Sequence, residues 1–303
     1  MFVIVDGLGR RSTPPNNSRI DDGTISSITC PESARSPVQS LALWPAPFHL
    51  NVCMVIRMKA NHELKGIQSF VVFDLETTGI DTWSDVPVSY ALVTRDSGIA
   101  GDPPSVSVES GLINPGVPIP GAASSIHHIT DDMVARAPDL ESATDAIATA
   151  LSGAWTRGAA VVGMNVGFDL TMLDSVLDRL GLGTLRDRSP GLGPIYDVLV
   201  LDRTFDKYRK GSRRLTDLCR HYDVELDSNA AHDAAADCLA TLGVLDRMME
   251  RYPDIGDLSP DVVMHQMSSW HQAWLTNYSK YRVSQGDEPI DPGQFVWPIH
   301  QPA

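Results

Sequence analysis

The sequence of 303 residues has few cysteines and no motif that would pair them. The four cysteines stand alone, and no Cys-x-x-Cys pair indicates a zinc or redox site. No apolar run approaches the roughly 18 residues that cross a bilayer. The first residues also lack the basic segment and long apolar segment of a secretory signal. We therefore expect a cytoplasmic protein that has no membrane partner.

Positive charge is also scarce. The chain has 24 lysines and arginines against 38 aspartates and glutamates, which gives a formal net charge of -14. This balance argues against broad electrostatic binding of nucleic acid, but it permits an enzyme that holds a few nucleotides through bound cations. The sign reverses in residues 203–214, which contain six basic residues and one acid. This run is either a solvated helix face or a phosphate clamp in which Arg213 and Arg214 bind the strand.

The pattern of the sequence divides the chain into three regions. Residues 1–66 are rich in serine, proline, asparagine and threonine and show no sustained period. We expect this region to be a disordered tail or a start-site extension, with the true start near Met58. Residues 67–250 carry strand and helix patterns and form the expected main domain. Residues 251–303 are expected to form a helical extension and a proline-containing tail.

Hydrophobic periodicity predicts one mixed sheet with helices packed on it. β-Branched and aromatic runs predict three strands of an antiparallel meander, at 69–75, 86–94 and 106–113. The second half alternates helices with short strands, and this order implies parallel strands. Its expected strands are 159–163 and 195–200, and the expected helices are 126–135, 140–155, 168–180, 215–222 and 232–249. The predicted fold class is therefore α/β, with a mixed five-stranded sheet flanked by helices.

The C-terminal extension carries one apolar stripe at helical spacing. Its members fall three or four positions apart, at Val263, Met267, Trp270, Trp274, Tyr278 and Tyr281. Packing against the core or against a second subunit is the favoured interpretation. Base stacking by Trp270 or Trp274 is the alternative.

Two acids lie close together in the first predicted strand. Asp74 and Glu76 are two residues apart, so their side chains point to the same face of the strand. Carboxylates placed side by side in an apolar strand repel each other and lose hydration, so they need a cation, a proton or a cap. Taken alone, the pair is more typical of a strand end that reaches solvent.

Three further candidates lie near helix starts. Asp169 follows a buried strand, at the sheet edge where α/β proteins build their sites, although a helix N-cap would explain it as well. His232 and Asp237 are five residues apart, which places them about 140° apart around one helix. We therefore expect His232 at the helix entrance, able to swing toward a substrate, and Asp237 in the second turn.

Together these five residues fit one kind of chemistry. The carboxylates of Asp74, Glu76, Asp169 and Asp237 offer only oxygen ligands, which favours Mg²⁺ or Mn²⁺ over Zn²⁺. Two such ions can activate a water molecule and stabilise the leaving oxygen of an in-line displacement. His232, as an imidazole, can accept the proton of that water at neutral pH. The set therefore predicts hydrolysis of a phosphodiester.

Three motifs, in this order, resemble those of the DEDDh family of 3′–5′ exonucleases, typified by the proofreading epsilon subunit of bacterial DNA polymerase III. They are Asp-Leu-Glu-Thr-Thr-Gly at 74–79, Asn-Val-Gly-Phe-Asp at 165–169 and His-Asp-Ala-Ala-Ala-Asp at 232–237. The resemblance covers residues 67–250. Met164 and His128 differ from many relatives, which have His and Gly there; we expect these departures to affect substrate preference more than activity.

The resemblance implies a ribonuclease H-like fold, two divalent cations and release of nucleoside monophosphates from a 3′ end. It implies that His232 is the base and that the four acids bind the ions. Contacts with the substrate are expected from Thr77, Thr78, Ile126, His127 and Asn165, besides Arg213 and Arg214.

The expected substrate is single-stranded DNA, in proofreading or repair, with a DNA polymerase as an expected partner. An RNA 3′ exonuclease of the same fold is one alternative, because these motifs do not read the 2′-hydroxyl. A non-catalytic module that binds nucleic acid or a polymerase is the other.

Overall fold

The computed structural model describes residues 64–67, 69–97, 105–226 and 233–302. All of these residues belong to one unit, Leu43–Ala303. The expected disorder of the N-terminal region and the expected position of His232 at a helix entrance lie outside the described residues.

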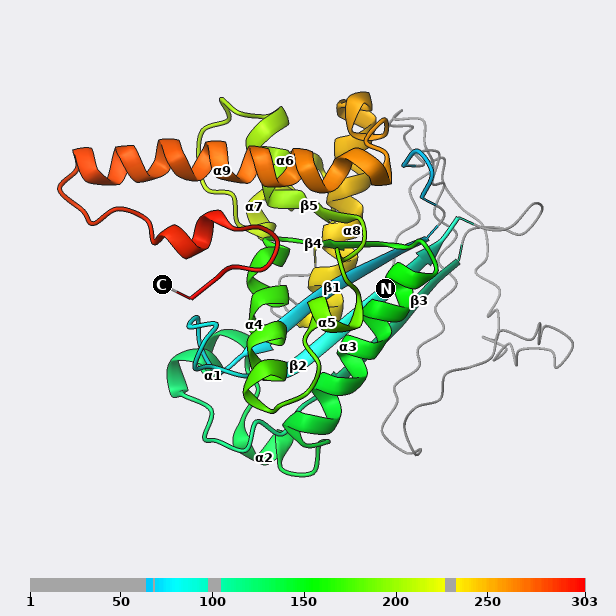
Figure 1. Cartoon of the computed structure of the whole chain (residues 1–303), viewed down its shortest axis with the longest axis vertical. Coiled ribbons are helices and arrows are strands. Elements are labelled where there is room, and N and C mark those ends of the chain that lie inside the picture. The colour runs from blue at the N-terminus through cyan, green and yellow to red at the C-terminus, as the bar shows by residue number, and fades with distance from the viewer. Residues whose placement is uncertain (1–63, 68, 98–104, 227–232, 303) are drawn as a thin grey trace, which may run out of the picture. The chain divides into compact units, whose positions relative to one another are not determined.

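Five strands form a single sheet (Figure 1). β1 (Ser69–Thr77) pairs antiparallel with β2 (Pro87–Asp96), and β2 pairs antiparallel with β3 (Ser105–Leu112). β4 (Ala160–Gly163) joins the other side of β1 in parallel, and β5 (Ile195–Asp197) joins β4 in parallel. The order β3-β2-β1-β4-β5 confirms the predicted mixed sheet, in which antiparallel strands are followed by parallel ones.

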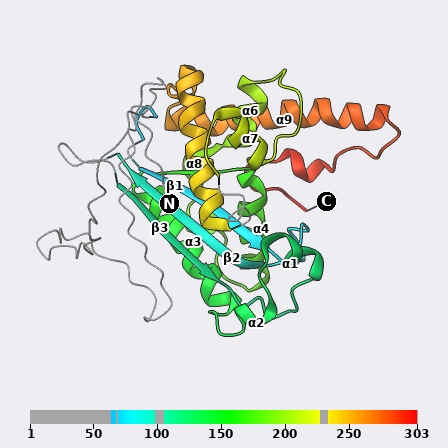
Figure 2. The ribbon, with the colours of Figure 1, turned by 180° about the vertical axis from the view of Figure 1, so that it is seen from behind.

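Helices cover both faces of the sheet. α3 (Leu140–Thr156) and α4 (Val166–Arg179) lie on one face and α8 (Ala234–Arg251) lies on the other (Figure 1 and Figure 2). β1 is therefore covered on both sides, and Val72 and Phe73, which point to opposite faces, are both 0% exposed. Burial on both faces explains the continuous apolar run that precedes Asp74.

The helix predicted at 126–135 is two helices in the structure, α1 (Gly121–His127) and α2 (Asp131–Val134). They separate where His128 adopts a left-handed φ of 60° and its backbone N–H bonds the Ser124 carbonyl, which closes α1. The remaining short helices are α5 (Leu185–Arg188) and α7 (Leu215–Tyr222).

The strand predicted at 195–200 ends at Asp197, and α6 (Val198–Phe205) begins directly after it. The Asp197 carboxylate Oδ1 accepts the backbone N–H groups of Leu199 at 2.9 Å and Val200 at 3.3 Å. This N-cap turns the chain into a helix. The apolar run at 195–200 could not by itself distinguish a strand from a helix, because its residues are buried in either element.

The C-terminal extension begins with η2 (Pro253–Ile255) and continues into the long helix α9 (Pro260–Ser284). α9 packs against α6 and β5. Val263 and Met267 are 0% exposed and belong to the main core. The first half of the apolar stripe therefore packs on the core, as the favoured interpretation expected.

The residues after α9 do not form a free tail. They pass through η3 (Pro292–Phe295), and Trp297 and Ile299 are then buried in the main core, at 6% and 2% exposure. The backbone N–H of His300 donates to Thr171 Oγ1 of α4 at 2.9 Å. The proline-containing composition indicated a tail because it carries no periodicity, whereas the burial depends on a surface formed by α4.

None of the helices in the described ranges combines the length and the apolar character that a bilayer crossing requires.

Candidate active site

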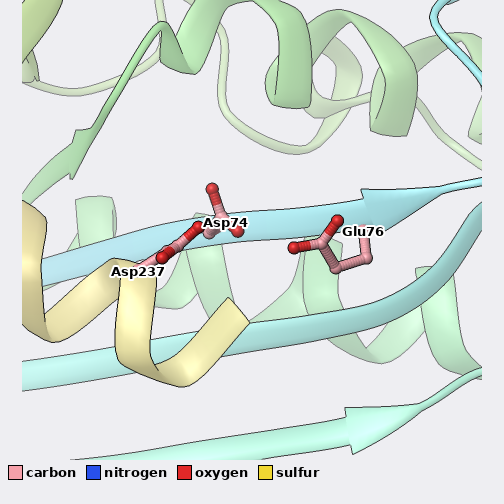
Figure 3. A group of neighbouring side chains, drawn as sticks. All are labelled: Asp74, Glu76 and Asp237. Atoms are coloured by element: carbon pink, nitrogen blue, oxygen red, sulfur yellow. The ribbon is translucent and has the colours of Figure 1, made fainter. Parts of the chain in front are cut away.

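The second half of β1 presents two carboxylates to the same side of the sheet. Asp74 and Glu76 follow the buried apolar run, and both side chains are half-buried. Asp237 lies in the first turn of α8 and not in the second as predicted, because α8 begins at Ala234; its side chain points toward Asp74 (Figure 3). Ligand oxygens of these three residues all lie within 4.8 Å of one another. We call Asp74, Glu76 and Asp237 the acidic group.

Two local features fix Asp237 over β1. The Asp233 carboxylate caps α8 by accepting the N–H groups of Ala235 at 3.0 Å and Ala236 at 3.1 Å. Cys238, which follows Asp237, is 0% exposed, and its Sγ lies 3.5 Å from the Val72 carbonyl oxygen. The start of α8 is thus held against the strand that carries the other two acids.

Asp169 lies beside the acidic group and is held by β1 itself. β1 and β4 are paired only as far as Val72, so the next N–H groups on that edge of β1 need other acceptors. The N–H of Leu75 donates to Asp169 Oδ1 at 3.1 Å, and Asp169 is 4% exposed in the first turn of α4. The hydrogen bond places this carboxylate beside Leu75, which lies between Asp74 and Glu76 in β1.

The electrostatics of the four acids are unfavourable in the absence of cations. Burial raises the pKa of Asp74 well above its ordinary value, and the carboxylates of Asp169, Glu76 and Asp237 raise it further. Burial also raises the pKa of Glu76, to about 8, with Asp237 and Asp233 adding to the shift. Burial raises the pKa of Asp169, although the hydrogen bond from Leu75 acts in the opposite direction.

Divalent cations would relieve this repulsion. The donor set consists of carboxylate oxygens that converge within a few ångströms, which is the chemistry that hard divalent ions prefer. The residues present therefore fit a divalent-cation site.

Asp197 holds the turn before α4, a positioning role that the sequence alone did not indicate. It is 2% exposed, and its Oδ1 accepts the N–H of Asn165 at 3.1 Å. Asn165 adopts a left-handed φ of 62° directly before α4, and its side chain is exposed. Asp197 thus holds the turn from which the helix of Asp169 begins. The signal that could have identified it is an aspartate between a buried strand and a helix, the pattern of an N-cap.

The two threonines after Glu76 close the turn between β1 and β2. Thr77 Oγ1 donates to the Gly79 carbonyl at 2.6 Å. Thr78 is 5% exposed; its hydroxyl donates to Asp85 Oδ1 at 2.9 Å and accepts the N–H of Val86 at 3.1 Å. The hydroxyl of Thr78 is therefore engaged inside the protein, which argues against its predicted contact with a substrate.

The two residues expected at the terminal nucleotide differ in exposure. Ile126 is 54% exposed on α1, which lies beside the end of β1 in both ribbon views (Figure 1 and Figure 2). His127 is buried, and its Nδ1 accepts the N–H of Ile129 at 3.0 Å. Ile126 is thus accessible to a ligand, whereas His127 supports the turn behind it.

The two arginines of the predicted phosphate clamp also differ. Arg213 turns inward: its Nη1 donates to the carboxylate of the buried Asp202, and its Nη2 donates to the Asp206 carbonyl at 2.9 Å. Arg214 is exposed at the N-cap position of α7. The contacts of Arg213 argue for a structural role, whereas the exposure of Arg214 leaves it open to solvent. The predicted base, His232, lies outside the described residues.

A family model described as "Exonuclease" matches residues 71–245 of the chain. The match begins in β1 and ends in α8, so it includes all four acids. It leaves out α9 and the residues after it.

Among curated proteins, the chain is similar to a PolC-type DNA polymerase III of Staphylococcus aureus. The two are 28% identical over 201 residues, which is 66% of this chain but 13% of that polymerase. The chain thus spans a small part of the length of the relatives that it matches.

Among solved structures, the chain is similar to E. coli exonuclease I in complex with a dA16 oligonucleotide. The TM-score is 0.51 at 21% identity, and the likeness covers 68% of this chain and 44% of that one. A zinc-bound complex of E. coli exonuclease I with single-stranded DNA gives a TM-score of 0.50 at 21% identity, covering 72% and 45%. These likenesses confirm the expected ribonuclease H-like exonuclease fold.

Proposed function

The chain belongs to the exonuclease family, as its DEDDh-type motifs predict, and on that premise we propose that it hydrolyses phosphodiester bonds from the 3′ end of single-stranded DNA. The products are nucleoside monophosphates. The observation that carries the proposal is the convergence of Asp74, Glu76 and Asp237 within 4.8 Å, with Asp169 beside them. We assign the exonuclease domain to residues 67–250.

Four acids hold the cations in this proposal: Asp74, Glu76, Asp169 and Asp237. We propose two ions, Mg²⁺ or Mn²⁺, because the donors are all carboxylates. When bound, the ions supply the positive charge that stabilises the developing charge of an in-line displacement at phosphorus. The protein contributes rigidity, since Leu75 fixes one oxygen of Asp169 and the Asp233 cap fixes the helix of Asp237.

His232 is the proposed general base. It directly precedes Asp233, which caps α8, and it is the only titratable group of the third motif that is not a carboxylate. It takes the proton from the attacking water and passes it to solvent, and the 3′ oxygen of the shortened strand, released as its bond to phosphorus breaks, takes up a proton from solvent.

The exposed neighbours of the acidic group are the proposed substrate contacts. The side chains of Ile126 and Asn165 are exposed, and Thr77 directly follows Glu76 at the end of β1. Ile126 packs against the terminal nucleotide, and Asn165 hydrogen-bonds it. We assign His127, Thr78 and Arg213 to positioning, because their polar atoms bond the protein itself.

The similar proteins favour DNA over RNA as the substrate. The S. aureus relative is a DNA polymerase, and the solved exonuclease I structures contain single-stranded DNA. The similarity to these proteins supports a role in proofreading or repair. In a proofreading role, the partner is a DNA polymerase.

A time course on 3′-labelled and 5′-labelled single strands, with and without EDTA, tests the proposal. We expect mononucleotides from the 3′-labelled strand first, with Mg²⁺ or Mn²⁺, and none with EDTA. Asp169→Asn and His232→Ala should abolish release while the protein stays folded. An RNA strand of the same sequence, cleaved faster than DNA, would make RNA the substrate. No release from any strand by the wild-type protein would favour a non-catalytic binding module.

A further inference from the structure

Three aromatic rings are stacked along the second half of α9. The rings of Trp274 and Tyr278 have centroids 4.8 Å apart and an interplanar angle of 25°. The rings of Tyr278 and Tyr281 have centroids 6.4 Å apart and an angle of 19°. Spacings of four and three residues bring them to one side of the helix. We call Trp274, Tyr278 and Tyr281 the aromatic ladder.

The ladder differs from the first half of the same stripe in its exposure. Val263 and Met267 are 0% exposed, whereas Tyr278 is 40% exposed and Tyr281 is 59% exposed. Figure 1 and Figure 2 both show the second half of α9 projecting beyond α6. Packing among the residues that the structure describes therefore explains the first half of the stripe but not the second. The ladder also lies outside the residues of the family match.

A cation lies on the inner end of the ladder. The guanidinium of Arg203, in the last turn of α6, is 3.4 Å from the centroid of the Trp274 ring. This contact fixes the ring and joins the ladder to α6. The chain leaves α6 directly into a segment rich in basic residues, residues 207–214, which we call the basic loop.

Part of the positive charge of the basic loop is exposed to solvent. Arg209 and Arg213 are held by Asp202. Lys207, Lys210 and Arg214 are exposed, and so is Tyr208 at 88%. In a chain with a formal net charge of -14, exposed cations next to exposed aromatic rings form a local surface of the opposite sign.

The surface is connected to the acidic group through α6. This helix begins at Asp197, which holds the turn of Asn165 before the helix of Asp169. Arg203 is its sixth residue and lies about 8 Å along the helix from Val198, and the ladder continues for seven more residues, about 10 Å, from Trp274 to Tyr281. A strand whose 3′ end lies at the acidic group would thus reach the exposed tyrosines with nucleotides several positions from that end.

We propose that the aromatic ladder and the basic loop bind the 5′ part of a single-stranded DNA substrate. Bases stack on the rings of Tyr278 and Tyr281, and phosphates bind Lys207, Lys210 and Arg214. The inference rests on the proposed exonuclease function. Flat rings accept any base, so this subsite holds the strand without reading its sequence. A protein partner fits less well, because the cores of protein interfaces are depleted in lysine.

Two double variants test the subsite, and the tyrosine variant is compared with a control on α9. Tyr278→Ala with Tyr281→Ala removes the exposed rings, and Lys207→Ala with Lys210→Ala removes two cations. Val283→Ala is the control, since Val283 is 54% exposed on α9 but is not part of the ladder. Nucleotide release is measured on a strand of about 16 nucleotides and on a trinucleotide, which is too short to reach the ladder.

We expect the tyrosine variant to raise KM for the long strand by about 10-fold or more, with kcat unchanged. The lysine variant should raise KM and flatten its dependence on salt, by about 0.7 in the log–log slope for each phosphate that it no longer binds. Rates on the trinucleotide should stay at the wild-type value, which also shows that the variants are folded.

An unchanged KM for the long strand in both double variants would overturn the subsite while leaving the proposed function intact. A tyrosine variant that converts a dimer into a monomer without changing KM would identify the surface as a contact between copies, and would overturn it as well. A wild-type protein that releases nothing from either substrate would instead contradict the exonuclease function itself.

Discussion

Two carboxylate centres in this protein, one buried and one half-buried, have opposite surroundings. Asp202 is 0% exposed, and the protein supplies its partners: Arg209 at 3.1 Å, Arg213, and the Tyr222 hydroxyl, which donates at 2.8 Å. Around Asp74, the charges that shift its pKa are other carboxylates, and they raise it. Burial alone therefore does not identify a functional acid. The sign of the surrounding charges distinguishes a carboxylate that stabilises the fold from one arranged for external cations.

Replacing an acid of each centre should separate these roles most strongly. Asp74→Asn should lower nucleotide release by about two to three orders of magnitude or more, because it removes charge that holds the cations. It should leave the free energy of unfolding of the metal-free protein unchanged or higher, because repulsion with Asp169 and Glu76 is relieved. Release rates and urea unfolding measure the two effects. A strongly destabilised Asp74→Asn would contradict the comparison.

The same change at the other centre should act on stability. Asp202→Asn leaves the guanidinium groups of Arg209 and Arg213 partly buried without their carboxylate. We expect the free energy of unfolding to fall by about 3–5 kcal/mol. Urea unfolding measures the decrease, and nucleotide release at a temperature where the variant is still folded provides the control. A variant as stable as the wild type would show that these arginines find other partners at no cost.

The stability of the metal-free protein should depend on pH through Glu76. Its pKa is raised from 4.5 to about 8 in the folded protein, so between these values the folded state binds more protons than the unfolded chain. The stability that proton binding to Glu76 contributes is fully present below pH 4.5 and is lost as the pH rises toward 8. Thermal stability should therefore fall over this window. Glu76→Gln should reduce the fall. A thermal stability that rises steadily across the window would contradict the raised pKa.

Divalent cations should reverse that destabilisation. Mg²⁺ or Mn²⁺ binds the ionised carboxylates, so it should raise the melting temperature more at pH 8 than at pH 5. At a hundred times the dissociation constant, the expected stabilisation is about 2.7 kcal/mol. The protein is first treated with EDTA, and the EDTA is then removed. Asp237→Asn is the control, and the cations should raise its melting temperature only weakly.

The smallest expected effect separates the two arginines of the basic loop. Arg214→Ala should raise KM for a long strand a few-fold, and the ratio to wild type should shrink with added salt, because the contact is electrostatic. Its unfolding should match that of the wild type, since Arg214 is exposed. Arg213→Ala should instead lower stability. If Arg213→Ala changes only KM, the main role of Arg213 is to bind the substrate and not to hold Asp202.

The sequence predicted the parts of the site that local rules determine. The period of a strand places Asp74 and Glu76 on one face, and the order of the three motifs brings in Asp169 and Asp237. It predicted the five-stranded sheet for the same reason, since runs and turns are local signals. The N-cap role of Asp197 was also within reach of a local rule.

Long-range partners were not predictable in this way. The inward turn of Arg213 depends on Asp202, and the burial of Trp297 and Ile299 depends on the surface of α4. A basic residue or a proline-containing segment has the same local pattern whether or not such a partner exists. The two halves of the α9 stripe likewise share one period, although only the first half is buried.

Titration of Mn²⁺ into the metal-free protein near neutral pH distinguishes a cation site from an acidic cluster that binds no metal. Calorimetry in two buffers of different ionisation enthalpy counts the protons released on binding. We expect Mn²⁺ to bind and to displace protons from carboxylates whose pKa is raised, and we expect Asp74→Asn to abolish both effects while Asp202→Asn retains them. Folded wild-type protein that binds no Mn²⁺, or that binds it no better than Asp74→Asn does, would show that the acidic group is not a cation site.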